Sequence, residues 1–264
     1  MAYINMHKLL QKDNTMVLAC DHGMEHGPKE FNEKNIDPNY ILDIALEGRY
    51  NAVVLHHGVA EKYYGAAYKD VPLILKLNGK TNLIPHIDPI SRQVCSVERA
   101  IKLGATAVGY TIYDGSPQES LMFQEFGNIV ERAHDYGMPV VAWMYPRGPY
   151  VKEELSTDIL AYSARLGLEL GADLIKMKYP TDLEGFKWVV KCAGRTKVLV
   201  AGMEKISDEH LLRRVYNVMQ TGVTGVAIGR NVWKNERPFS LSKALREIIF
   251  HNKTPEQARE LLKG

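Results

Sequence analysis

Two lysines lie in a short apolar segment where uncharged side chains are expected. Gly171-Ala172-Asp173-Leu174-Ile175-Lys176-Met177-Lys178-Tyr179 leads from a predicted helix end into a predicted strand. Because strand side chains alternate between faces, Lys176 and Lys178 share one face and Ile175 and Met177 the other. If the Ile175 face packs on helices, both lysines point inward. Burial and the neighbouring like charge then favour the neutral, nucleophilic amine that forms a Schiff base. A lysine that is ion-paired at a strand end is the alternative interpretation.

Eight short runs of apolar or β-branched residues predict strands. They lie at 16–20, 52–55, 73–77, 107–111, 140–143, 174–177, 198–201 and 226–228. Most are separated by stretches with apolar residues at three- and four-residue spacing, which predict helices at 39–47, 96–103, 118–136, 158–170, 183–193 and 208–221. A shorter helical segment is expected at 58–64, and 78–93 and 144–156 are interpreted as long loops.

The alternation of strands and helices indicates the fold. Eight such units on one chain predict parallel pairing with right-handed crossovers, and therefore an α/β, single-domain (β/α)8 TIM barrel over residues 1–264. An open doubly wound sheet is the alternative. That fold would place a glycine-rich turn after its first strand, whereas Asp21-His22-Gly23-Met24-Glu25-His26-Gly27-Pro28 is acidic and histidine-rich. A C-terminal helical segment, about 241–263, is interrupted near Thr254-Pro255 and is expected on the outside of the barrel or against another subunit.

Polar residues follow six of the predicted strands. In a closed parallel barrel these positions converge at one end, where chemistry takes place. They are Asp21, His22, Glu25 and His26; His56 and His57; Lys76, Asn78 and Lys80; Tyr110, Tyr113 and Asp114; Trp143, Tyr145 and Arg147; and Lys176 and Lys178.

The seventh and eighth strands end in small residues instead. Val200-Ala201-Gly202-Met203 and Ile228-Gly229-Arg230 leave backbone N–H groups accessible, and Arg230 adds a charge that matches phosphate oxygens. In barrels this pair of loops is the usual phosphate site. Plain turn geometry is the alternative explanation for the two glycines.

A divalent metal is a competing interpretation of the histidines. His22, His26, His56, His57 and His86, with Asp21 and Glu25, are residue types that bind zinc. The first two lie on what is interpreted as a glycine-broken loop, and a pair of ammonium groups in the same cavity would repel a dication. We therefore expect no metal ion.

Composition excludes several classes of partner. The 264 residues are 45% hydrophobic and carry a formal net charge of +2, with no extended basic stripe for nucleic acid or anionic lipid. No apolar run approaches the roughly 20 residues that span a bilayer, and residues 1–8 lack an apolar signal core. Cys20, Cys95 and Cys192 are widely spaced, which is typical of free thiols in a reducing compartment. We expect a cytoplasmic protein.

Several motifs, in order along nearly the whole chain, resemble those of the archaeal-type class I fructose-1,6-bisphosphate aldolases. They are Ala19-Cys20-Asp21-His22-Gly23-Met24-Glu25-His26-Gly27-Pro28, Leu75-Lys76-Leu77-Asn78-Gly79-Lys80-Thr81, Val108-Gly109-Tyr110-Thr111-Ile112-Tyr113, Trp143-Met144-Tyr145-Pro146-Arg147-Gly148, Ala172 to Tyr179, and Ile228-Gly229-Arg230-Asn231-Val232-Trp233. The resemblance implies an enzyme that needs no cofactor, acts on a small phosphosugar, and forms a homo-oligomer built as pentamer rings or a decamer.

The resemblance also implies roles for single residues. Lys176 matches the Schiff-base lysine, Tyr145 the proton-transfer residue and Asp21 the aspartate after strand one. Trp143 matches a pocket residue, and Gly202, Met203, Gly229 and Arg230 fall on the phosphate loops. Lys178 is expected to help keep Lys176 neutral. Arg147 and His26 are candidates for a second phosphate.

Two departures from the family pattern are visible. Ala201-Gly202-Met203 replaces a typical Ser-Gly-Gly, which removes a hydroxyl donor, and Pro180-Thr181 stands where a Thr-Gly pair is common. Relatives with the same lysine and tyrosine carry out a transaldol-type transfer (2-amino-3,7-dideoxy-D-threo-hept-6-ulosonate synthase) or a thiolase-like step on a phosphorylated sugar fragment. These activities, and a non-catalytic phosphosugar-binding barrel, are the alternatives to the aldolase.

Overall fold

A closed barrel of eight parallel strands forms the centre of the molecule. The computed structural model describes residues 4–84, 88–202 and 204–263. The strands pair in the order β1-β10-β9-β8-β7-β6-β3-β2, and β1 pairs with both β2 and β10, which closes the ring. Their bounds are β1 (Thr15–Ala19), β2 (Ala52–His56), β3 (Leu73–Lys76), β6 (Ala107–Ile112), β7 (Val140–Met144), β8 (Leu174–Met177), β9 (Lys197–Ala201) and β10 (Gly225–Ile228). The predicted (β/α)8 barrel is confirmed, and the open sheet is excluded.

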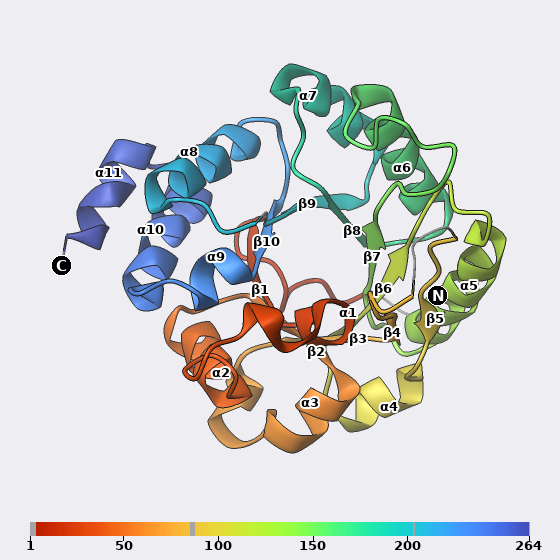
Figure 1. The fold of residues 1–264 in the computed structure, drawn as a ribbon, viewed down its shortest axis with the longest axis horizontal. Coiled ribbons are helices and arrows are strands. Elements are labelled where there is room, and N and C mark those ends of the chain that lie inside the picture. The colour runs from red at the N-terminus through yellow and green to blue at the C-terminus, as the bar shows by residue number, and fades with distance from the viewer. Residues whose placement is uncertain (1–3, 85–87, 203, 264) are drawn as a thin grey trace.

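Helices surround the barrel, as Figure 1 shows. Their bounds, including the 3₁₀ turns η1 to η3, are α1 (His22–His26), η1 (Gly27–Glu30), α2 (Pro38–Glu47), α3 (His57–Tyr63), η2 (Ala66–Asp70), α4 (Val97–Lys102), α5 (Glu119–Asp135), α6 (Thr157–Glu169), α7 (Leu183–Cys192), α8 (Asp208–Met219), α9 (Arg230–Trp233), α10 (Pro238–His251), α11 (Pro255–Arg259) and η3 (Glu260–Leu262). None of the helices in the described ranges is long and apolar enough to cross a membrane.

Local sequence signals explain where several helices begin. The side chains of Ser96, Ser156 and Ser207 accept the backbone N–H three residues on, at the starts of α4, α6 and α8. Gly171, between α6 and β8, has a φ of +88°, a backbone conformation that residues other than glycine rarely adopt. This turn sets the start of the strand that carries Lys176.

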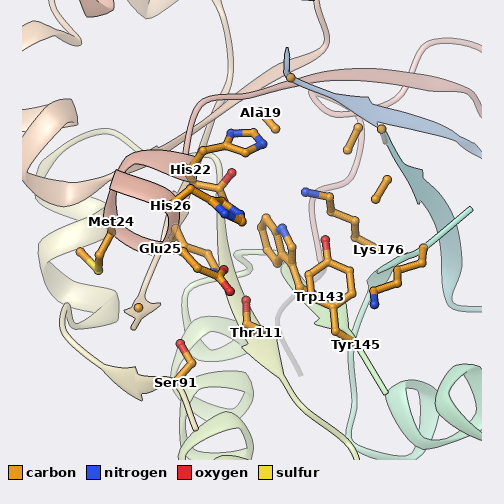
Figure 2. Close-up of a pocket in the computed structure, with 18 of the residues that line it drawn as sticks. Ala19, His22, Met24, Glu25, His26, Ser91, Thr111, Trp143, Tyr145 and Lys176 are labelled. Atoms are coloured by element: carbon orange, nitrogen blue, oxygen red, sulfur yellow. The ribbon is translucent and has the colours of Figure 1, made fainter. Parts of the chain in front are cut away.

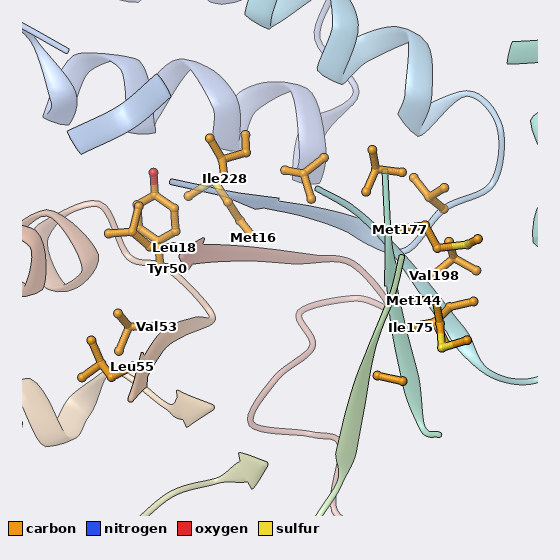
Figure 3. Close-up of a cluster of buried hydrophobic side chains, with 14 of the residues drawn as sticks. Met16, Leu18, Tyr50, Val53, Leu55, Met144, Ile175, Met177, Val198 and Ile228 are labelled. Carbon is orange, nitrogen blue, oxygen red and sulfur yellow. The ribbon is translucent and has the colours of Figure 1, made fainter. Parts of the chain in front are cut away.

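Two apolar layers bury the faces of the strands. The outer layer fills the space between strands and helices and contains Ile175 and Met177, with Met144 and Val198 beside them (Figure 3). The inner layer fills the barrel and contains Leu174. Because β8 alternates between these layers, its next inward residue is Lys176, in agreement with the predicted orientation.

Two segments differ from the expected loops. Residues 78–93, interpreted as one long loop, contain a small antiparallel pair, β4 (Asn78–Gly79) and β5 (Arg92–Gln93). Asn78 holds this pair to the barrel. Its side-chain NH₂ donates to the carbonyls of Ser91 and Thr111, and its side-chain oxygen accepts the N–H of Thr111. The stretch after β1, also expected to be a loop, forms α1.

The C-terminal segment forms two helices and a short turn on the outside of the barrel. α10 packs against α8 and α2, and the residue after it, Asn252, has a left-handed conformation that ends the helix. α11 then begins with a capping box from Thr254 and Gln257, at the interruption that the sequence indicates.

Candidate active site

A cavity of about 440 Å³ opens at the carboxyl ends of the barrel strands. Among the polar residues expected there, it is lined by Asp21, His22, Glu25, His26, His56, Lys76, Lys80, Tyr113, Trp143, Tyr145, Arg147, Lys176 and Lys178. Gly202, Gly229 and Arg230 line it as well. Figure 2 shows Lys176, Trp143 and Tyr145 facing His22, His26 and Glu25 across this space.

Four polar residues at strand ends lie outside the cavity lining: His57, Asn78, Tyr110 and Asp114. The Tyr110 side chain points to the outer layer, where its hydroxyl donates to Glu125 at 2.7 Å. Asp114 is bound by the Ser163 hydroxyl. Residue type at a strand end therefore predicts the neighbourhood of the cavity but not the direction of each side chain.

Lys176 lies on the inner face of β8 and is 7% exposed. Its Nζ is 5.2 Å from the centre of the Trp143 ring, because the two residues are register partners on β8 and β7. A second buried lysine, Lys76 of β3, has its Nζ at the same distance from that ring. Within the described residues neither amine forms an ion pair or a hydrogen bond. Two buried amines thus share one aromatic ring in the cavity.

Burial determines the protonation of both amines. It lowers the pKa of Lys176 below its usual value, and the charges of Asp21 and Glu25 oppose this effect. Burial, reinforced by the charge of Lys176, lowers the pKa of Lys76 to about 8, although Asp21 opposes it. The neutral amine is therefore more accessible here than in water, and it is the form that attacks a carbonyl carbon.

The position of Lys178 corrects one expectation. It follows the last residue of β8, and its Nζ lies 2.5 Å from a carboxylate oxygen of Glu154. A lysine paired in this way has its charge balanced locally. The charge that couples to Lys176 is that of Lys76, because the charge of Lys176 lowers the pKa of Lys76. The sequence signal for Lys76 was its place at the end of the third strand.

Asp21 follows the end of β1 by two residues, and its charge interacts with those of both lysines. Burial would raise the pKa of this carboxyl, but the charges of Lys176 and Lys76, with those of His22 and His56, hold it well below its usual range. Asp21 is thus an anion in the cavity and partly balances the two amines.

Tyr145 follows β7, and its backbone N–H binds the carbonyl of Ile112 at 3.0 Å. Burial, together with the negative charge of Asp21, raises the pKa of its phenol well above the usual value. The phenol therefore remains protonated at neutral pH and can act as a proton donor.

Gly109 on β6 determines where the Trp143 ring can lie. A Cβ atom at this position would stand 2.0 Å from the ring, so only glycine leaves room for it. The indole Nε1 is buried and has no hydrogen-bond partner in the described part of the chain. A ligand atom that accepts a hydrogen bond from this N–H would therefore stabilise the complex.

The predicted phosphate loops meet at the carboxyl ends of β9 and β10. Gly202 and Gly229 both line the cavity; a Cβ on Gly229 would lie 2.6 Å from the His22 ring. Arg230 begins α9, and its Nη1 lies 3.2 Å from Glu30 of η1. Met203, the remaining residue of this predicted group, lies outside the described residues.

The histidines are arranged differently from the sequence interpretation. His22 and His26 are one turn apart on α1, not on a loop, and their ring centres are 6.1 Å apart. Burial lowers the pKa of His22 to about 4, and it likewise lowers that of His56 to about 4. In residues 4–84, 88–202 and 204–263 no group of three histidine, cysteine or acidic residues could hold a metal ion. His86 lies outside these ranges.

Comparison with known proteins agrees with this geometry. A family model described as DeoC/LacD family aldolase matches residues 15–235. A class 1 fructose-bisphosphate aldolase of Thermoproteus tenax is 46% identical, over 92% of either chain. One of Halobacterium salinarum is 39% identical, over 92% of this chain and 93% of the relative.

Solved structures give the same result. One is an archaeal fructose-1,6-bisphosphate aldolase with its catalytic lysine covalently bound to the carbinolamine intermediate of the substrate. It superposes with a TM-score of 0.88 at 44% identity, and the match covers 92% of this chain and 97% of that one. An aldolase of Slackia heliotrinireducens superposes with a TM-score of 0.90 at 27% identity, covering 100% and 94%. The chain belongs to the DeoC/LacD family of aldolases, among the archaeal-type class I fructose-bisphosphate aldolases.

Proposed function

We propose that this protein is a Schiff-base-forming aldolase that reversibly cleaves fructose 1,6-bisphosphate to dihydroxyacetone phosphate and glyceraldehyde 3-phosphate. The observation that carries the proposal is the buried Lys176 amine, which faces the cavity with a lowered pKa. The names of the relatives support it, since several are class 1 fructose-bisphosphate aldolases. This reaction is a step of glycolysis and gluconeogenesis.

Lys176 starts the reaction as the nucleophile. Its neutral nitrogen attacks the C2 ketone and gives a carbinolamine, which loses water to form a protonated imine. Trp143 packs beside this nitrogen, and the free indole N–H is available to a substrate hydroxyl. Asp21, an anion close to both lysines, stabilises the cationic imine and orients hydroxyl groups.

Tyr145 moves the proton. As the C3–C4 bond breaks, the C4 hydroxyl passes its proton to the oxygen of Tyr145 while the phenol's own proton passes to the carboxylate of Asp21, and the bonding electrons pass to the imine to form an enamine. Asp21 gives this proton back to Tyr145 when the phenol protonates C3. Glyceraldehyde 3-phosphate leaves, the phenol of Tyr145 returns a proton to C3, and water hydrolyses the imine to release dihydroxyacetone phosphate. Tyr145 suits this role because the raised pKa of its phenol keeps it protonated between turnovers.

The loops after β9 and β10 would hold the phosphate nearest the ketone. Gly202 and Gly229 line the cavity and have no side chain, Arg230 supplies a charge, and Met203 belongs to the same predicted group. Fixing this phosphate places the ketone against the Lys176 amine and lowers the entropic cost of the reaction. Ala201 has no hydroxyl, and the N–H of Gly202 already donates to the carbonyl of Ala227 at 2.7 Å. Phosphate binding would therefore depend on Arg230 and on the other backbone N–H groups of these loops.

Borohydride trapping tests the proposal. Reduction of the imine formed with dihydroxyacetone phosphate should add the mass of the reduced adduct to the peptide that contains Lys176, and Lys176→Arg should show neither trapping nor turnover. The chelator EDTA should leave turnover unchanged. If trapping fails and EDTA abolishes turnover, a metal-dependent route replaces this one; absence of both trapping and turnover would indicate a binding protein.

We also propose a cytoplasmic homo-oligomer. The three cysteines are free thiols, which suits a reducing compartment. Tyr162 and Trp188 are 73% and 58% exposed on the neighbouring helices α6 and α7, and exposed aromatic side chains are enriched at protein interfaces. Light scattering coupled to gel filtration would give the mass of the assembly; a monomer at micromolar concentration contradicts this proposal.

A further inference from the structure

The short helix α9, which directly follows Gly229, is fixed to the first part of the barrel. Its last residue, Trp233, is 1% exposed, and the indole N–H donates to the carbonyl of Ala19 at 3.1 Å. The Trp233 ring stacks on Phe31 with the ring centres 5.5 Å apart, and the side chain of Asn35 donates to the Trp233 carbonyl at 3.3 Å. Packing and hydrogen bonds therefore hold α9 to β1 and the segment after it.

Asn231, the second residue of α9, connects this helix to the loop after β9. Its side chain is buried, with the residue 1% exposed. Oδ1 accepts the N–H of Ile206 at 2.9 Å, and Nδ2 donates to the carbonyl of Glu204 at 3.0 Å. The backbone carbonyl of Asn231 also accepts Lys205 Nζ at 3.4 Å. One buried amide thus binds the backbone of the loop on both sides of Lys205.

The loop that Asn231 binds faces the cavity. Gly202 and Glu204 of this loop line it, as does Arg230 of α9. The loops after β9 and β10 are in close contact where the strands end, since a Cβ on Gly202 would lie 3.1 Å from the Cα of Ile228. Beyond that contact, the Asn231 amide determines how far the loop stands from α9 and hence from Arg230.

The loop needs this support because it lies at the surface. The side chains of Glu204 and Lys205 are exposed, so packing does little to order them. A segment that becomes ordered only when a ligand binds loses backbone entropy at that step, which weakens binding. A loop that is already held in place avoids this loss. Removal of the amide would also leave the Ile206 N–H and the Glu204 carbonyl without these partners.

We propose that Asn231 is a positioning residue for the phosphate nearest the ketone, because its side chain holds the loop after β9 at a fixed distance from Arg230. The inference rests on the proposed function and adds to it a residue that acts through the loop backbone. Asn231 therefore sets how strongly a phosphorylated ketone is preferred over the same ketone without phosphate. The chemistry at Lys176 does not depend on it.

The experiment compares dihydroxyacetone phosphate with dihydroxyacetone, which lacks only the phosphate. For each ketone, mass spectrometry after borohydride reduction gives the second-order rate constant for adduct formation on the peptide that contains Lys176. Asn231→Ala should reduce the ratio of the two constants about 10- to 100-fold, the effect of leaving buried backbone groups without hydrogen bonds. The constant for dihydroxyacetone should stay at its wild-type value, because the amine and its surroundings are unchanged.

Asn235→Ala is the matched control. Asn235 follows α9, where its Nδ2 donates to Oδ1 of Asp208 at 2.6 Å and its Oδ1 accepts the N–H of Arg237 at 2.8 Å. This variant also loses two side-chain hydrogen bonds near α9, but neither of them holds the loop after β9, so the ratio should stay at its wild-type value. Asn231→Ser leaves one polar atom at the position and should give an intermediate ratio; it serves as the test if Asn231→Ala does not fold.

The outcomes separate the inference from the function on which it rests. If the Asn231 variants keep the wild-type ratio, the loop holds its position without the amide and only this inference fails. It also fails if both rate constants fall by the same factor, or if Asn235→Ala lowers the ratio as much as Asn231→Ala, since Asn231 would then support the barrel in general. If the wild-type protein forms no adduct with either ketone, the proposed function itself is wrong.

Discussion

The amine of Lys176 and the phenol of Tyr145 lie in one cavity, and burial favours the neutral form of each. Burial lowers the pKa of an amine and raises that of a phenol, because the low dielectric disfavours whichever form is charged. One buried environment thus prepares a nucleophile and a proton donor together. Different variants can therefore remove each group separately.

Tyr145→Phe should leave the nucleophile in place and remove the proton donor. We expect kcat for bisphosphate cleavage to fall about 10²- to 10⁴-fold, the usual contribution of a positioned acid or base. Borohydride should still trap dihydroxyacetone phosphate on Lys176, as mass spectrometry of the reduced protein would show. A kcat within tenfold of the wild-type value would assign the proton transfer to another group.

Lys76→Met should change the titration of Lys176. The two amines share one buried site, so each ammonium disfavours protonation of the other. With Lys76 gone, Asp21 acts on Lys176 alone and the pKa of Lys176 rises. The rate of borohydride trapping, measured against pH, should therefore increase at a higher pH than in the wild-type protein.

Lys178→Met is the matched control for this experiment. Lys178 lies two residues from Lys176 in the chain, but its charge is paired with Glu154. The trapping profile of this variant should coincide with that of the wild-type protein. Equal shifts in both variants would mean that the total positive charge of the cavity, not the Lys76 contact, determines the titration.

At the scale of the elements, close contact between β6 and β7 places the Trp143 ring beneath the two amines. Gly109→Ala would put a methyl group about where the ring now lies. We expect the ring to move, at a cost of about 1–3 kcal/mol in the free energy of unfolding. Urea unfolding measures that cost. A loss of kcat/KM together with a changed tryptophan emission would show that the ring positions the substrate.

The elements also show how far the sequence predicts this molecule. The eight barrel strands were predictable because each is a short apolar run and most of them are followed by a stretch with helical periodicity. Helix α1 was not, because it has five residues, includes Gly23, and depends on distant contacts such as Met24 with Gly79. The sequence placed Lys76 among the residues at the strand ends. It did not show that Lys76 lies near Lys176, because the two meet only when the barrel closes.

At the scale of the whole molecule, one buried carboxyl outside the cavity links barrel stability to pH. Asp114 follows β6 and is 5% exposed; the Ser163 hydroxyl of α6 donates to its Oδ2, and its Oδ1 has no partner in the described part of the chain. Burial raises the pKa of this carboxyl from 3.8 to about 6, and nearby Glu119 adds to the rise. The Asp114 carbonyl also accepts the Arg147 N–H at 2.9 Å, which ties this loop to the one after β7.

The sign of the effect follows from proton binding. Because the folded state holds the Asp114 proton more tightly than the unfolded chain, this group destabilises the fold progressively as pH rises from about 4 to about 6. The full effect is about 3 kcal/mol at 1.36 kcal/mol for each pKa unit.

Asp114→Asn cannot ionise, so the variant should gain stability relative to the wild-type protein over this range and no further above it. Urea unfolding at pH 4.5, 5.5 and 7, with Asp158→Asn on the exposed first turn of α6 as the control, measures the difference. Parallel pH dependences for the wild-type protein and Asp114→Asn would mean that the carboxyl reaches water when it ionises, and that the loops after β6 and β7 separate to allow it.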